Sequence, residues 1–175
     1  MPSISFGQPV IRSIRSGSGL FFDVHMMVTD PGRYIDDMVK AGADSITIHA
    51  EACEDPMAVL RQIHAAGVRS GISIKPATDV KIVEQFLPET DLVLIMTVEP
   101  GFGGQKYIES STEKIRQTRR MIDAQERRIH LQVDGGICDE TLPVVLEAGA
   151  DRIVAGSWVF GGDLAQNVRR IRPML

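Results

Sequence analysis

The sequence predicts an α/β protein whose parallel strands curve into a barrel. Uniformly apolar, strand-like runs alternate with helical ones, and this alternation is typical of a parallel sheet that is buried on both faces. A helix that ends on glycine and leads into a strand occurs at Lys40–Asp44 and again at Glu147–Asp151, with a looser copy at Ala65–Val68. Residues of functional character follow many different strands. A barrel is therefore favoured over an open doubly wound sheet, because its site collects residues from every strand's carboxyl end.

Turn and capping residues divide the chain into its elements. Apolar residues at helical spacing predict a short helix over Gly7–Arg15, and Ser16–Gly19 forms a flexible turn before the strand Leu20–Val28. The next two helices begin at a capping residue beside proline and end at glycine. The expected helices are Thr29–Ala41, Asp55–Gly67, Asp79–Leu87, Ser110–Gln125, Asp139–Gly149, Trp158–Phe160 and Asp163–Ile171, and the further expected strands are Ser45–His49, Ser70–Ile74, Asp91–Met96, Arg128–Val133 and Arg152–Ala155.

Size, charge and cysteine content are those of an ordinary globular protein. The 175 residues suffice for one domain, residues 1–175, with a sizeable core. A net charge of −4 gives no basic face for nucleic acid, and no apolar run approaches the ~20 residues that span a membrane. Two cysteines are too few for a disulfide framework, so we expect a reducing compartment. The N-terminus has no signal-peptide pattern, and the cytoplasm is the expected location.

Three glycine-rich tips follow strands and predict a phosphate-binding rim. They are Gly101–Gly104 after the fourth strand, Gly135 with Gly136 after the fifth, and Gly156 with Ser157 after the sixth. A single glycine after a strand is more often only a turn residue. Three in the same relation to a strand offer backbone N–H groups that can hold a dianion, and barrels often place phosphate after their last two strands.

One aspartate and one histidine are the candidates for chemistry. Asp134 ends an apolar strand in Asp-Gly-Gly; a strand-end aspartate is often a cap or turn former, but the neighbouring glycine tips favour a role in chemistry. His25 lies inside an apolar strand, where a histidine is more often a core residue than a ligand. Asp23 shares its strand face and is expected to orient the His25 ring. His49 is a weaker candidate at the end of its strand, and Lys75 at the rim is expected to meet an anion.

Taken together, these segments resemble the ribulose-phosphate 3-epimerase family. The resemblance runs from Ile4 to the C-terminus and is strongest in five segments: Asp23–Val28, His49–Ala52, Leu94–Gln105, Val133–Gly136 and Ala155–Ser157. It implies a TIM-barrel fold and the interconversion of D-ribulose 5-phosphate and D-xylulose 5-phosphate in the pentose phosphate pathway. It also implies a divalent metal, zinc, iron or manganese, and a phosphorylated ketopentose as the substrate.

The resemblance also assigns roles to single residues. It makes His25 and Asp134 metal ligands, and it makes Asp134 one acid of a catalytic pair of aspartates. The residues that it implies for substrate or phosphate binding are His25, Gly101, Phe102, Gly103, Gly104, Asp134, Gly135, Gly136, Gly156 and Ser157.

The sequence departs from the family at its beginning. Residues 1–9 resemble the segment that follows the family's second strand, so we expect the first strand, the first helix and the second strand to be missing. That part of the family carries a His-x-Asp with two further metal ligands and the opposing aspartate. We therefore expect strands 3 to 8 of the barrel, a weakly held metal and two unpaired edges, Leu20–Val24 and Arg152–Ala155, which predict a homodimer or higher homo-oligomer.

Three functions remain open on the sequence. The first is phosphopentose epimerisation, which is doubtful for this chain alone because one acid and two metal ligands are not found. The second is a phosphosugar-binding or structural remnant without catalysis. The third is a related ketose-phosphate 3-epimerase, such as one for allulose 6-phosphate.

Overall fold

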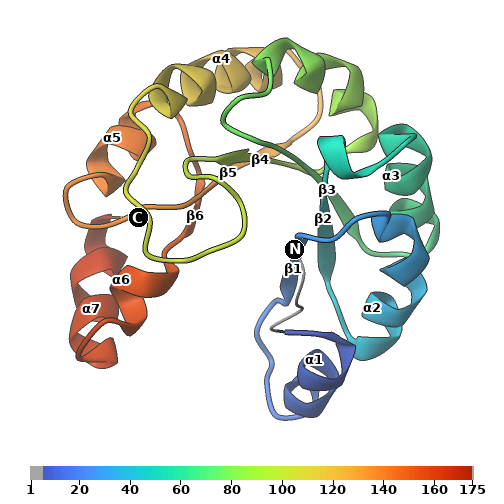
Figure 1. Ribbon diagram of the computed structural model, residues 1–175, viewed down its shortest axis with the longest axis horizontal. Helices are drawn as coiled ribbons and strands as arrows, with labels where there is room; N and C mark the ends of the chain where they lie inside the picture. The colour runs from blue at the N-terminus through green and yellow to red at the C-terminus, as the bar shows by residue number, and fades with distance from the viewer. Residues whose placement is uncertain (1–5, 175) are drawn as a thin grey trace.

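The protein is an incomplete parallel barrel. A computed structural model describes residues 6–174, and in it six parallel strands lie side by side in chain order. Figure 1 shows the sheet curved into an open ring, with a gap between the first and the last strand. The expected fold class, six parallel strands of an incomplete barrel, is confirmed. The strands are β1 (Asp23–Met26), β2 (Ser45–His49), β3 (Arg69–Ile74), β4 (Leu92–Met96), β5 (His130–Asp134) and β6 (Arg152–Val154).

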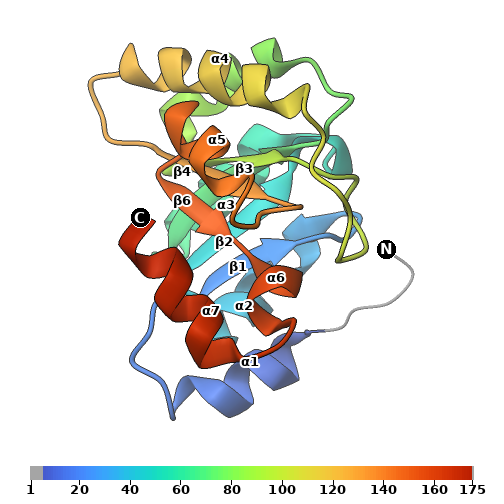
Figure 2. The ribbon, with the colours of Figure 1, turned by 90° about the vertical axis from the view of Figure 1, so that its left-hand side faces the viewer.

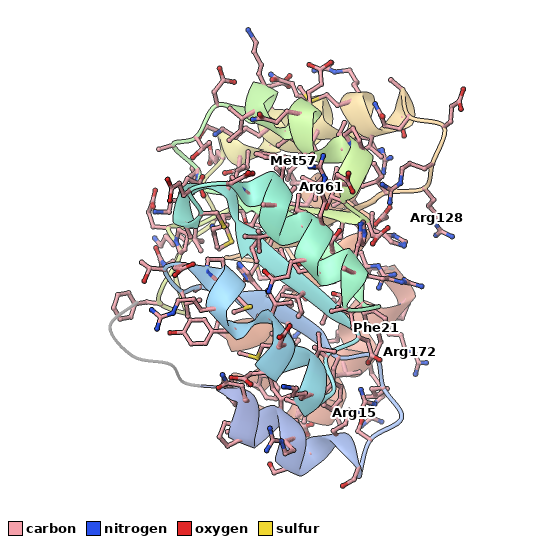
Figure 3. All side chains as sticks on the ribbon, turned by 90° about the vertical axis from the view of Figure 1, so that its right-hand side faces the viewer. Arg15, Phe21, Met57, Arg61, Arg128 and Arg172 are labelled. Atoms are coloured by element: carbon pink, nitrogen blue, oxygen red, sulfur yellow. The ribbon has the colours of Figure 1, made fainter. Side chains whose placement is uncertain are left out.

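Helices cover only the outer face of this sheet (Figures 1 and 2). The α-helices are α1 (Gln8–Arg15), α2 (Ile35–Ala41), α3 (Pro56–Ala65), α4 (Ser111–Asp123), α5 (Leu142–Glu147), α6 (Gly156–Phe160) and α7 (Leu164–Ile171). The 3-10 helices are η1 (Pro31–Tyr34), η2 (Ala50–Ala52), η3 (Val80–Glu89) and η4 (Arg172–Met174). Figure 3 looks onto α2 and α3 and shows Met57 and Arg61 on α3.

Most expected elements form, and four differ. The helix expected over Thr29–Ala41 is divided into the 3-10 helix η1 and the α-helix α2, which begins only at Ile35. β1 is shorter than the expected Leu20–Val28. The helix expected over Asp79–Leu87 is the 3-10 helix η3, which contains Pro88, and proline cannot donate the α-helical hydrogen bond. α5 begins at Leu142 and not at Asp139. The Thr141 hydroxyl there accepts from the Cys138 N–H and donates to the Gly136 carbonyl, which holds the preceding residues in a turn.

The core has two parts that lie on opposite faces of the sheet. The larger part fills the space between the strands and the outer helices, with fully buried residues such as Ile46, Ile72 and Leu131. The smaller part, Leu92, Leu94, Met96 and Val98, is a separate apolar cluster that includes alternate residues of β4. Facing residues of β2 and β3 are instead polar and buried: Ser45, Thr47, His49 and Ser73. The inner face therefore has an apolar side and a polar side.

A reciprocal pair of hydrogen bonds joins every second strand to the one before it. An aspartate that stands just before β2, β4 or β6 donates its N–H to the carbonyl of a residue in the preceding strand region, at 2.8–2.9 Å. Its carboxylate accepts from the N–H of that same residue at 2.7–3.1 Å. The pairs are Asp44 with Phe22, Asp91 with Ser70, and Asp151 with Leu131. We call these three pairs the aspartate clasps; they group the sheet into β1–β2, β3–β4 and β5–β6.

An arginine completes each aspartate clasp and explains the repeated glycine. The carboxylates pair with Arg15 at 2.8 Å, Arg127 at 2.6 Å and Arg119 at 3.5 Å, respectively. Gly42 and Gly149 have positive φ angles of 103° and 106°, which close α2 and the segment after α5. A Cβ on either glycine would overlap the side chain of Arg15 or Arg119. The Ala-Gly-Ala-Asp repeat thus combines a helix stop, room for an arginine and the carboxylate that binds it.

The edges of the sheet and the helix lengths bear on two further expectations. β1 and β6 are the outermost strands, as expected, and the segment Met1–Ser5 lies outside the described residues. Apolar side chains near the gap are exposed, Leu20 to 75% and Phe160 to 74%. Within residues 6–174 no helix has the length and apolar character needed to cross a membrane. The cytoplasmic location stays a prediction.

Replacing Asp91 is expected to weaken the fold in a pH-dependent way. Burial raises the pKa of Asp91, but hydrogen bonds from His64 and the Ser70 N–H, with the charges of His64 and Arg127, lower it below its usual value. Asp91→Ala should lower the free energy of unfolding at pH 7 by about 1–3 kcal/mol, since hydrogen bonds to a half-exposed charge are lost. A depressed folded pKa gives stability that is present above the unfolded pKa, about 4, and is lost as the pH falls through the folded pKa. The difference from wild type should therefore shrink in acid.

Urea unfolding at pH 7 and at about pH 3 measures this effect. Asp123→Ala is the matched control, because its side chain is 64% exposed and pairs with Arg119 on the surface of α4. That change should cost at most about 0.5 kcal/mol. Equal losses for the two variants at pH 7 would contradict a special role for the aspartate clasp.

Candidate functional site

The predicted glycine tips and the predicted acid surround one cavity. Because all strands run parallel, their carboxyl ends meet at one end of the barrel. A cavity of about 380 Å³ lies there. Its lining includes Gly101, Phe102, Gly103, Gly104, Asp134, Gly135, Gly136, Gly156 and Ser157, together with Met27, Met96, Glu99 and Gln105. All the predicted site residues except His25 line this cavity. His25 lies beside it, with its Nδ1 atom 3.5 Å from the Asp134 carboxylate.

Thr97 fixes the Asp-Gly-Gly tip of β5. Its N–H donates to the carbonyl of Asp134 at 2.9 Å, and its hydroxyl donates to the carbonyl of Gly135 at 2.5 Å. The side chain is fully buried directly after β4. This residue was missed on the sequence, where a threonine after an apolar strand gives little signal. Its contacts hold the backbone that carries the Asp134 carboxylate.

The loop after β4 folds over the same tip. The Gln105 side chain donates to the carbonyl of Glu99 at 2.6 Å and to that of Phe102 at 2.8 Å, which closes the glycine-rich loop on itself. Further along, the backbone of Tyr107 lies so close to Gly136 that a Cβ there would overlap it, and Gly136 has a φ of 66°. Glycine is required at this position both by the close approach and by the backbone angle.

Two histidines stack beside Asp134. Nδ1 of His25 lies 3.5 Å from Oδ2 of Asp134, and Nε2 of His25 lies 2.8 Å from Nε2 of His49. The ring centroids are 4.9 Å apart. The weaker candidate His49 therefore does face the site, and it is only 3% exposed. Burial lowers the pKa of His49, and the opposing effect of Glu51 does not restore it, so this ring is neutral at pH 7.

Glu51 is a second residue that sequence reasoning did not single out. Oε2 of Glu51 lies 3.5 Å from Nδ1 of His49, while Oε1 accepts from the Lys75 N–H at 2.8 Å and from the Thr78 hydroxyl. Burial raises the pKa of Glu51, but the hydrogen bonds from His49, Lys75 and Thr78 lower it to about 2. The carboxylate is therefore ionised throughout the neutral range. The feature of the sequence that could have identified Glu51 is its position two residues after His49.

The expected role of Asp23 is wrong. Its carboxylate accepts from the Ser45 hydroxyl at 2.5 Å and from the Gln132 side chain at 2.8 Å, and the ring of His25 is instead held by His49 and Asp134. Residues two apart on a strand share a face but sit more than 6 Å apart along it. Asp23 therefore lies one level deeper in the barrel than His25 and connects β1 with β2 and β5.

The donor atoms suit part of a metal site. Two ligands of one zinc ion, each roughly 2.1 Å from it at a tetrahedral angle, are roughly 3.4 Å apart. The 3.5 Å between Nδ1 of His25 and Oδ2 of Asp134 matches that separation. Among residues 6–174, however, no group of three or more histidine, cysteine, aspartate or glutamate side chains is arranged to hold a metal. The fit is limited to two coordination positions.

The chain resembles curated epimerases over most of its length. Residues 1–160 match the family model described as Ribulose-phosphate 3 epimerase family. The chain is 42% identical over 174 residues to a protein named ribulose-phosphate 3-epimerase from Bacillus subtilis (strain 168), covering 98% of this chain and 80% of that protein. A protein of the same name from Treponema pallidum (strain Nichols) is 44% identical over 164 residues, covering 94% and 75%. One from Mycobacterium bovis is 43% identical over 163 residues, covering 93% and 71%.

Solved structures with a similar fold are more distant in sequence. The 3-hexulose-6-phosphate synthase from Salmonella typhimurium has a TM-score of 0.72 at 19% identity, covering 97% of this chain and 80% of that chain. The 3-keto-L-gulonate-6-phosphate decarboxylase from Vibrio cholerae O1 has a TM-score of 0.73 at 16% identity, covering 96% and 78%. At these identities the likeness supports the fold alone.

A series of glycine-to-alanine changes is expected to separate the contributions at the cavity. Gly136→Ala should cost about 2–4 kcal/mol of unfolding free energy, because it adds backbone overlap with Tyr107 to an unfavourable φ. Gly104 also has a positive φ, 76°, but open space around it, so Gly104→Ala should cost about 1 kcal/mol. Gly103 has neither constraint, and Gly103→Ala should stay within about 0.5 kcal/mol.

Denaturant unfolding of the three variants under one condition measures this order. Loss of the order, with Gly103→Ala as costly as Gly136→Ala, would show that the loop after β4 is not packed on the Asp-Gly-Gly tip as described.

Proposed function

The chain belongs to the ribulose-phosphate 3-epimerase family, and from this membership we propose that it binds a phosphorylated ketopentose and transfers a proton at the carbon next to the carbonyl. The single observation that supports this most is the cavity, which places the Asp134 carboxylate among three glycine tips. Backbone N–H groups in such tips bind phosphate, and a carboxylate at their side can take a proton from the bound sugar.

Asp134 supplies one half of an inversion. A carbon next to a carbonyl is inverted when a proton leaves from one face and another returns to the opposite face, which two acids on opposite sides accomplish. The family resemblance assigns only Asp134 of that pair to these residues. Glu99 also lines the cavity, but it comes from the loop after β4 on the exposed rim. The 175-residue chain is therefore proposed to remove and return a proton on one face.

His25 and Asp134 are the residues that would hold a divalent metal. When bound, zinc, iron or manganese supplies positive charge beside the substrate oxygens that become negative. Two protein ligands are fewer than the three of most catalytic zinc sites, so the proposed binding is weak. Without a bound metal, the ring of His25 and the carboxylate of Asp134 are close enough to interact with each other directly.

Phosphate binding is expected to depend on the open space at Gly156. No atom lies within 4 Å of a Cβ built there, so an aspartate fits without strain and brings its charge into the cavity. Gly156→Asp should weaken binding of inorganic phosphate at least about tenfold, because like charges a few ångströms apart repel by more than about 1 kcal/mol. Gly156→Asn has the same size without the charge and should bind more tightly than the aspartate variant. Calorimetric titration that gives equal affinities for wild type and Gly156→Asp would contradict the proposal.

Proton exchange is expected to exceed inversion. In deuterium oxide, the chain should incorporate deuterium at carbon 3 of D-ribulose 5-phosphate faster than it forms D-xylulose 5-phosphate, since Asp134 acts on one face and no acid for the second face is assigned among residues 6–174. Asp134→Asn should slow the exchange by about 10²–10⁴-fold. Proton NMR of the sugar follows both reactions, and allulose 6-phosphate assayed in parallel tests the related substrate.

Two outcomes would contradict single-face transfer. Inversion near the usual enzymatic rate, about 10 per second, would mean that another acid acts, and Glu99→Gln would test that residue. Tight binding of the sugar phosphate without any exchange would favour the phosphosugar-binding remnant.

A second copy of the chain is proposed to cover the open edges. Within residues 6–174, β1 and β6 each have one side without a strand partner, and unpaired strand edges promote association. Exposed apolar side chains adjoin both edge strands along the chain, Leu20 and Phe21 just before β1 and Phe160 and Leu164 after β6. A two-fold dimer buries both in one interface and is the commonest assembly. The Ser16–Gly19 turn would allow α1 to cross to the partner.

Light scattering is expected to give the mass of a dimer or larger oligomer at micromolar concentration. Leu20→Lys combined with Phe21→Lys should shift the mass towards the monomer, because it places two charges at the proposed interface. Val144→Lys, at an exposed position of α5, is a control for added charge away from β1 and β6. A clean monomer mass for the unmodified chain would defeat the proposal.

A further inference from the structure

A second cavity adjoins the glycine-tip cavity at the carboxyl end of the sheet. It has a volume of about 200 Å³ and lies among the loops that follow β1, β2, β3 and β4, whereas the glycine tips follow β4, β5 and β6. Met27 and Glu99 line both cavities, so the two are neighbours. Three charged side chains line the second cavity: Glu51, Lys75 and Glu99. Phosphate binding and proton transfer, as proposed above, make no use of this space.

The place of the second cavity determines which part of a substrate it can receive. In the proposed binding mode the phosphate lies at Gly136 and Gly156, and Asp134 acts on carbon 3 of the sugar. In a 2-ketose 5-phosphate, carbon 3 separates the phosphate end from the carbon-2 carbonyl and the carbon-1 hydroxyl group. The carbon-1 end therefore points away from the tips of β5 and β6, towards the loops after β1 to β4. A space of 200 Å³ is several times the ~30 Å³ share of one water molecule, so a hydroxymethyl group fits there.

The charges in the lining suit a neutral hydroxyl group and disfavour an anion. The backbone N–H of Lys75 is bound to Glu51, whereas its ammonium group forms no ion pair among residues 6–174. A hydroxyl group can accept a hydrogen bond from an ammonium group and donate one to a carboxylate at the same time. A second phosphate would instead meet the carboxylates of Glu51 and Glu99, and the single positive charge of Lys75 offsets only one of them.

The loop after β3, which carries Lys75, is held from two sides. On one side, Oε1 of Glu51 accepts from the Lys75 N–H at 2.8 Å and from the Thr78 hydroxyl. On the other side, Nζ of Lys114 in α4 donates to the carbonyl of Pro76 at 2.5 Å and to the carbonyl of Thr78. The backbone of this loop is therefore fixed before a ligand binds, which lowers the entropy cost of binding there. Oε2 of Glu51 makes none of these loop contacts and can accept from a ligand.

We propose that the second cavity is a hydroxyl-selective subsite for the carbon-1 end of the phosphorylated ketose, with Glu51 and Lys75 as its specificity-determining residues. The Lys75 ammonium group donates to the carbon-1 oxygen, and Oε2 of Glu51 accepts the proton of that hydroxyl group. Glu51 and Glu99 together repel a second phosphate, so the site selects a 5-phosphate over a 1,5-bisphosphate. This assignment rests on the proposed function for the position of the first phosphate.

A pair of sugar phosphates that differ only in the carbon-1 oxygen tests the hydroxyl contact. Calorimetric titration of the unmodified chain should show 1-deoxy-D-xylulose 5-phosphate binding about tenfold more weakly than D-xylulose 5-phosphate, because a hydrogen bond to a charged group is lost. In Lys75→Met this ratio should fall to about twofold or less. Lys81→Met is the matched control, since Lys81 is an exposed lysine of η3 that lines neither cavity, and it should keep the tenfold ratio.

D-Ribulose 1,5-bisphosphate tests the repulsion of a second phosphate. It should bind the unmodified chain at least about tenfold more weakly than D-ribulose 5-phosphate. Glu51→Gln removes one negative charge but keeps an oxygen for the Lys75 N–H, so it should narrow this difference, whereas Lys75→Met should widen it. Opposite shifts separate the subsite from a general loss of structure, which would weaken binding in both variants. Glu54→Gln, at an exposed position that lines neither cavity, should leave the difference unchanged.

The outcomes distinguish this subsite from the proposed function. Equal affinities for the deoxy compound and D-xylulose 5-phosphate, with inorganic phosphate still bound, would overturn the subsite and leave phosphate binding at the glycine tips standing. Shifts of the same sign in Glu51→Gln and Lys75→Met would overturn it as well. Absence of binding for inorganic phosphate and for every sugar phosphate would overturn the proposed function, and this assignment with it.

Discussion

The aspartate clasp is the constraint on which the rest of the structure depends. In each of the three clasps one aspartate uses its N–H and its carboxylate on both backbone atoms of a single residue in the neighbouring strand region, so the two strands cannot slip without losing both bonds. The clasp at Asp151 fixes the register of β5 and β6, which pairs Asp134 with Val154, and Thr97 after β4 contacts the Asp-Gly-Gly tip from the other side. A shift by one residue would turn Asp134 out of the barrel and into the helical layer. Fixing the strands at their amino ends thus positions the acid at their carboxyl ends.

The second constraint is the uneven inner face of the sheet. Apolar Leu94 and Met96 on β4 lie on one side of the site, and the polar Thr47 and Ser73 on β2 and β3 lie on the other. Asp134 and His25 meet where these sides join. Because the apolar side and the buried rings keep water away, charges and hydrogen bonds there act at greater strength than on the surface.

The local features of the site could be predicted from the sequence, but most of its contacts between distant residues could not. Gly136 and Gly156 could be recognised because each follows a strand directly, although only Gly136 requires glycine, and Asp134 could be recognised because it stands between a strand and two glycines. Thr97 could not be recognised, since its partner Asp134 is 37 positions away, and Glu51 offered only its spacing after His49, since its contact with Lys75 spans 24 positions. Asp23 was misplaced because strand periodicity gives the face of a side chain but not its depth. The curved six-stranded order followed from the alternation of elements, whereas nothing in the sequence distinguished the 3-10 helix η3 from an α-helix.

The spacing of the clasps also says how such a chain can be assembled in time. Each carboxylate binds a backbone N–H only 20–22 residues earlier in the sequence. Closing a loop of that size costs little conformational entropy and is fast compared with chain synthesis. A pair of strands can therefore be registered as soon as its aspartate has left the ribosome, before the next pair exists. The sheet is then built by addition of finished pairs.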